Sequence, residues 1–77
     1  MTFTISRKLN NLFTVRATSY SEAAAKAARK LYGRKATANR TTGRNGASGY
    51  FQAYEPMPRR LGGGLNSVGE PFHVSER

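Results

Sequence analysis

The chain has 77 residues, and its thirteen Lys and Arg against four Glu give a formal net charge of +9. A chain of this length buries a thin core, which argues against a function that needs a deep, dry pocket. It has no cysteine for disulfides or thiolate metal sites, and no apolar run approaches the ~20 residues of a membrane span. We therefore expect a cytoplasmic protein without a membrane-spanning segment.

The N-terminal part is predicted to be a β-hairpin. Thr2 to Leu9 and Leu12 to Thr18 each alternate along the chain with the period of a half-buried strand. Asn10 and Asn11 between them predict the turn, because asparagine tolerates positive φ. The apolar residues expected to face the core are Phe3, Ile5, Leu9, Phe13, Val15 and Ala17.

A helix is predicted from about Tyr20 to Tyr32. Ser19 and Glu22 have the spacing of a capping box, in which Glu22 bonds back to the amide of the cap residue. Gly33 is expected in the left-handed position that ends a helix. At helical spacing, the side that faces the sheet carries Tyr20, Ala23, Ala24, Ala27, Ala28 and Leu31.

A second hairpin is predicted after the helix. Arg34 to Thr42 forms its first strand, Gly43 to Gly49 its glycine-rich loop, and Tyr50 to Glu55 its second strand. Pro56 ends this strand, because proline cannot donate to a strand ladder.

Beyond residue 58 the composition changes. Arg59 to Gly64 is predicted to be a flexible basic linker, and Glu70 to Glu76 a tail or a short edge strand. The expected architecture is a two-layer α+β fold in the order ββαββ, with the alanine-rich helix on one face of an antiparallel sheet. Residues 1–58 form its single domain, and residues 59–77 the linker and tail.

Positive charge is concentrated between Lys26 and Arg44, where no acidic residue occurs. Nucleic acid is the commonest partner for such a field, because each phosphate that is neutralised releases counterions. The alternative is a surface that only confers solubility. Two tyrosines of the open sheet face would stack on bases, although hydroxyl and aromatic residues also favour any solvated sheet face. The residues expected to contact nucleic acid are Arg16, Lys26, Arg29, Lys30, Arg34, Lys35, Arg40, Arg44, Tyr50 and Tyr54.

Catalysis is not expected. The only histidine is His73, and the only carboxylate side chains are four glutamates, of which Glu22 is assigned to the helix cap. His73 with Glu70 or Glu76 gives too few ligands for a metal site. We expect no enzyme activity, no metal and no cofactor.

Three kinds of function remain open. The first is a nucleic-acid-binding protein, for DNA or RNA, with mainly phosphate contacts and little sequence specificity. The second is an inhibitor or adaptor that docks on an acidic protein surface or on a nucleoprotein complex. The third is a small structural subunit whose tail adds a strand to a neighbour.

The run FTVRATSYSEAAAKAARKLYGRKATANRTT, followed by GYFQAYEP, resembles some very small phage-encoded proteins in the order of its elements. Certain anti-CRISPR proteins are among them. The resemblance covers about half of the chain and implies a phage or plasmid origin. It also implies an inhibitor that blocks the nucleic-acid site of a host complex.

Overall fold

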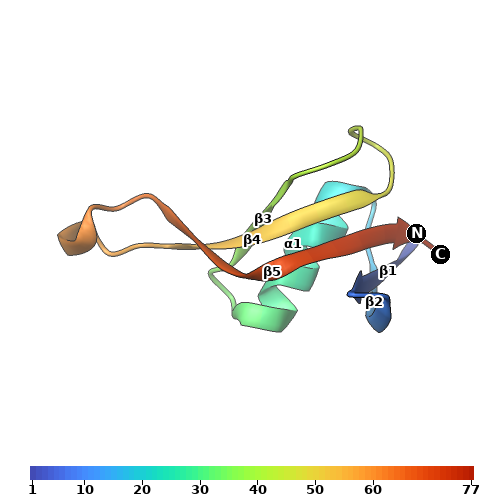
Figure 1. Ribbon diagram of the computed structural model, residues 1–77, viewed down its shortest axis with the longest axis horizontal. Coiled ribbons are helices and arrows are strands. Elements are labelled where there is room, and N and C mark those ends of the chain that lie inside the picture. The colour runs from blue at the N-terminus through green and yellow to red at the C-terminus, as the bar shows by residue number, and fades with distance from the viewer.

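The computed structural model describes residues 1–77 as a five-stranded antiparallel sheet covered on one face by a single helix (Figure 1). The sheet order is β2-β1-β5-β4-β3. This confirms the predicted two-layer α+β fold, and the C-terminal segment, predicted to be a tail or an edge strand, is the fifth strand. The elements are β1 (Thr2–Arg7), β2 (Asn10–Arg16), α1 (Tyr20–Tyr32), β3 (Thr37–Arg40), β4 (Gly49–Pro56), a 3-10 turn η1 (Arg59–Leu61) and β5 (Leu65–Glu76).

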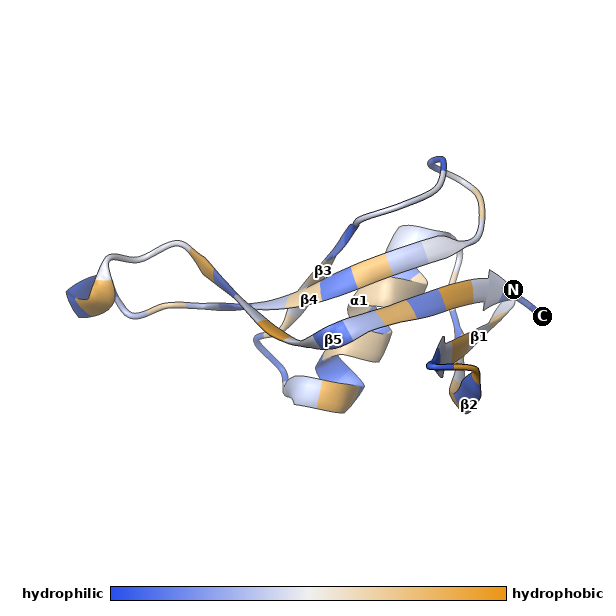
Figure 2. Cartoon of the chain, viewed as in Figure 1, coloured by the Kyte–Doolittle hydropathy of each residue, from blue (hydrophilic) through white to orange (hydrophobic).

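The core lies between α1 and the sheet. Four alanines of the helix are completely buried, and so are the bulky side chains opposite them. Each fully buried aromatic or branched side chain contributes about 1.5–3 kcal/mol, whereas alanine mainly allows the helix to approach the sheet closely. The largest buried side chains are Phe3, Ile5, Phe51, Phe72 and Val74. The predicted inward faces of β1 and β4 are thus confirmed, and Figure 2 shows the alternation along β4 and β5.

The helix begins and ends at the predicted residues. Ser19 Oγ accepts a hydrogen bond from the backbone N–H of Glu22 at 3.1 Å. The Glu22 carboxylate accepts from the backbone N–H and the hydroxyl of Thr18, both at 3.2 Å, one residue before the predicted partner. At the other end, the N–H of Gly33 donates to the carbonyl of Arg29, with φ at +119°. This φ is positive as predicted, but ψ of 170° is extended and not left-handed helical.

The turn of the first hairpin differs from the prediction. Lys8 and Leu9 form it, with φ of +49° and +67°, and Asn10 and Asn11 pair within β2. Leu9 is therefore fully exposed, and its prediction as an inward residue was wrong. Leu12 is an extra residue opposite the Ile5–Ser6 step, and this bulge restores the register in which Phe13 and Val15 pack against the core.

Strand β3 is shorter than predicted. A turn follows the helix, with the N–H of Ala36 donating to the carbonyl of Gly33 at 3.1 Å, and Ala36 is buried. Lys35 consequently lies in this turn and not on the open face of the sheet, where the longer strand would have placed it.

The C-terminal segment differs most from its prediction. The sequence predicts a tail or an edge strand for Glu70–Glu76, but β5 is twelve residues long and lies in the middle of the sheet. It pairs with β1 on one side and with β4 on the other. Phe72 and Val74 are completely buried, which explains why this strand is held at the centre. Residues 57–64, which include the predicted linker, connect β4 to β5 at the tip of a projecting hairpin (Figure 1).

Candidate nucleic-acid interface

Most of the positive charge has no ionic partner within the protein. Only two ion pairs form, between Lys8 and Glu70 at 3.0 Å and between Lys26 and Glu22 at 3.6 Å, although the chain has thirteen Lys and Arg. Both pairs are exposed, and such pairs contribute little to stability. The positive charge of the remaining cations is not neutralised by an ion pair.

The outer face of α1 carries three of the predicted residues, all exposed. Lys26 also donates a hydrogen bond to the carbonyl of Arg16 at 2.7 Å, which ties the helix to the end of β2. The Nζ atom of Lys30 lies 4.6 Å from the centroid of the Phe13 ring, a cation–π contact. Arg29 has no ion pair. The helix thus presents a cationic surface in which Lys26 and Lys30 have fixed positions.

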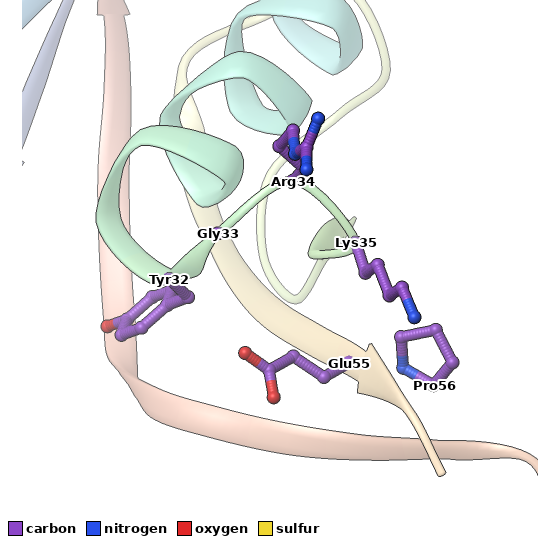
Figure 3. Close-up of a pocket in the computed structure, with 6 residues that line it drawn as sticks. All are labelled: Tyr32, Gly33, Arg34, Lys35, Glu55 and Pro56. Carbon is purple, nitrogen blue, oxygen red and sulfur yellow. The ribbon is translucent and has the colours of Figure 1, made fainter. Parts of the chain in front are cut away.

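Arg34 and Lys35 extend this surface past the end of the helix. Together with Tyr32, Glu55 and Pro56 they line a hollow of about 260 Å³ (Figure 3). In Figure 3 the Glu55 side chain extends from β4 toward Tyr32, and the Arg34 side chain points away from Glu55. The hollow is a poor anion pocket, because it contains a carboxylate and lies beside the negative end of the helix dipole.

The two arginines of the predicted loop site have different surroundings. Arg40 donates to the carbonyls of Thr42 at 3.2 Å and Ala47 at 2.7 Å, and so holds the loop between β3 and β4. A Cβ at Gly49 would lie 2.5 Å from the backbone carbonyl oxygen of Thr42, which cannot easily move, so this position requires glycine. Arg44 is exposed and has no ion pair. Of the two, Arg44 is the freer to meet a ligand.

The open face of the sheet is polar and aromatic. Tyr50 is 46% exposed, and its ring meets that of His73 edge-on at 4.9 Å. Hollows of about 480 and 240 Å³ flank Tyr50, and Lys8 lines both. Gln52 has a structural role, since its side-chain amide donates hydrogen bonds to the carbonyls of Val68 and Gly69. Sequence reasoning missed His73 as a neighbour of Tyr50 because the C-terminal segment was predicted to be a tail or an edge strand and was not placed beside β4.

The predicted residues therefore do not form one surface. Lys26, Arg29 and Lys30 lie on the helix, which covers one face of the sheet, and Arg34 and Lys35 follow in the next turn (Figure 1). Tyr50 and Tyr54 alternate with the buried residues of β4 and so lie on the opposite face, as does Arg16 on β2. A single short ligand would contact either the helix side or the tyrosines.

Two further cations, Arg59 and Arg60, were missed because their segment reads as a linker. They lie exposed in η1 at the end of the β4–β5 hairpin. Pro58 and the three glycines at positions 62–64, which lie between two alternating segments, are the turn signal that would have found this hairpin.

The chain contains no cluster of three or more His, Cys, Asp or Glu able to hold a metal ion, and no helix long and apolar enough to cross a membrane. No family model matches the chain, and a search of curated proteins found no match.

Proposed function

We propose that this protein binds nucleic acid, DNA or RNA, mainly through phosphates and with little sequence specificity. The observation that carries the proposal is the uncompensated cationic surface of the helix and the turn after it, defined by Arg29, Lys30, Arg34 and Lys35. None of these four residues has an ion-pair partner, and all are exposed. Phosphate contacts from such a surface give affinity without base readout.

The test compares the wild-type protein with a variant in which these four residues are replaced by Gln. Fluorescence anisotropy would measure binding to labelled single- and double-stranded DNA and RNA at several salt concentrations. If all four residues contact phosphates, the salt slope on duplex DNA falls by about 3.6, because each phosphate contact contributes ~0.9. Gln keeps the side-chain stem, and far-UV circular dichroism checks that the variant is folded.

Equal affinity and equal salt slope for the two proteins would contradict the proposal. The cationic surface would then fit an acidic protein surface or a nucleoprotein complex, as in a phage-type inhibitor of host defence. A pull-down from a bacterial lysate with wild-type and variant protein would test that alternative.

A further inference from the structure

The β4–β5 hairpin projects beyond the body of the protein as an arm, which we define as residues 54–67. The molecule measures 41 Å along this direction and 22 Å across (Figure 1). Within the arm, Tyr54, Glu55 and Pro56 pair with Ser67, Asn66 and Leu65, and only Tyr54 has a further partner, Thr37 of β3. An isolated two-stranded hairpin is marginally stable. The arm adds nothing to the buried core, so its length calls for another explanation.

The tip of the arm is a defined turn. The carbonyl of Pro58 accepts hydrogen bonds from the N–H groups of Leu61 at 2.9 Å and Gly63 at 3.2 Å, and Met57 N–H donates to the Gly64 carbonyl at 2.9 Å. The three glycines at positions 62–64 all have positive φ, and nothing lies within 4 Å of a Cβ added at any of them. Glycine is required here by the backbone conformation and not by crowding.

The tip combines cationic and apolar side chains. Arg59 and Arg60 are exposed without ion pairs, and Leu61 beside them is 62% exposed. No acidic residue occurs between Pro56 and Gly69. The two guanidinium groups select an anionic partner, and the leucine selects one that also offers an apolar surface. Stacked base pairs between two phosphate backbones offer both.

The composition of the tip favours the minor groove of duplex DNA. Arginine together with an apolar wedge is the combination that proteins insert into the minor groove to kink the duplex. Arg34 and Lys35 lie at the root of the arm, where they share a hollow with Pro56 (Figure 3).

We infer that the arm enters the minor groove of duplex DNA, where Arg59 and Arg60 contact phosphates and Leu61 inserts between two base pairs and bends the duplex. This inference rests on the proposed nucleic-acid binding. It specifies that the polymer is duplex DNA and that the protein bends it.

The experiment measures bending and binding on the same sample. A duplex of about 30 base pairs carries a donor and an acceptor dye at its two ends, and anisotropy of the same duplex reports binding. The wild-type protein is expected to bend the duplex by roughly 20–90°, which raises energy transfer. The L61A variant should bind but lose most of this change, and the double variant R59Q/R60Q should lower the salt slope by about 1.8.

The matched control is L9A, because Leu9 is also an exposed leucine and lies in the turn of the β1–β2 hairpin. It should bend DNA as the wild type does. Binding without bending by the wild type, or equal bending by L61A, overturns the inference and leaves the proposed function intact. Absence of duplex binding by the wild type overturns the inference, and absence of binding to single-stranded DNA and to RNA as well overturns the proposed function too. L61A protein that bends DNA normally but no longer sediments with anionic phospholipid vesicles would assign the tip to a membrane surface instead.

Discussion

The guanidinium carbon of Arg40 lies 4.6 Å from the centroid of the ring of Phe51, its cross-strand neighbour. With its hydrogen bonds to Thr42 and Ala47, this contact makes Arg40 a structural residue of the loop. We expect R40A to lower the free energy of unfolding by about 1–3 kcal/mol, from the lost cation–π contact and hydrogen bonds. Urea denaturation without nucleic acid measures this effect.

Arg44 is the matched control, since it lies in the same loop without these contacts. R44A should change stability by less than about 0.5 kcal/mol. If Arg44 contacts a phosphate, its loss should lower the salt slope on duplex DNA by about 0.9. Equal stability of R40A and R44A would show that Arg40 does not hold the loop.

Glu22 gives the protein a predictable response to acid. The pKa of its carboxyl is lowered from the ordinary value of 4.5, chiefly because it accepts hydrogen bonds from the backbone N–H and the hydroxyl of Thr18, with a smaller contribution from Lys26. A carboxyl whose pKa is lowered by folding stabilises the protein above its unfolded pKa, and this stabilisation is lost as the pH falls through the folded pKa. The wild type should therefore have a higher melting temperature than E22Q at neutral pH, and the difference in melting temperature should shrink below pH 4.5.

S19A provides the comparison for this experiment. The hydroxyl of Ser19 does not titrate. S19A should therefore lower the free energy of unfolding by about 0.5–2 kcal/mol at every pH where the protein is folded. Melting curves of the three proteins from neutral to acid pH separate the two effects. A difference between wild type and E22Q that does not depend on pH would contradict the role given to the carboxylate.

Gly69 and Tyr32 are closely packed between β5 and the end of the helix. Gly69 has φ of +67°, and a Cβ built on it would overlap the Tyr32 hydroxyl, which also accepts a hydrogen bond from Arg7 at 3.1 Å. G69A should destabilise the protein by about 1–3 kcal/mol, through backbone strain and steric overlap. G46A, at φ of +81° with open space around it, should cost only the strain. Thermal denaturation should show G69A to be the less stable of the two, and equal losses would contradict the packing argument.

The helix and the inward strand faces could be predicted because their signals are local. Ser19, Glu22 and Gly33 mark the ends of α1, and period-two alternation fixes which residues of β1 and β4 face it. The first turn could not be placed, because Asn10 and Asn11 suit positive φ better than Lys8 and Leu9 do. The bulge at Leu12 restores the register in which the inward residues face the core. It forms only when the two strands pair, so neither strand alone predicts it.

The central position of β5 also depends on pairing over a long sequence separation. Pro71 argues against a central strand, since it has no N–H to donate. It is tolerated because Gly69, Glu70 and Pro71 bulge opposite Gln52, between the pairs Phe51–Phe72 and Ala53–Val68. The exposure of the helix cations followed from helical periodicity. Two features could be seen only in the folded structure. The helix cations lie on the opposite face of the sheet from Tyr50, and Arg40 makes inward contacts.

The placement of Tyr50 on the face opposite the helix predicts a difference between polymers. Stacking needs unpaired bases, so Y50A should weaken binding to single-stranded DNA by about 1–3 kcal/mol and leave duplex binding unchanged. Y54A tests the second predicted tyrosine in the same way, and anisotropy with both polymers measures the two effects. Both side chains point away from the core, so the double variant should keep its fold. Unfolding of that variant, or an equal loss on duplex DNA, would contradict this assignment.

The central claim is that the uncompensated cations bind phosphates, and the salt dependence of duplex binding tests it most directly. We would measure the association constant of the wild-type protein with a mixed-sequence duplex from low to physiological salt. Four phosphate contacts on the helix side predict a slope of about −3.6 in log K against log salt, and the arm would make it steeper. A slope near zero would contradict the account, and so would a lack of detectable binding to this duplex, to single-stranded DNA and to RNA at every salt concentration.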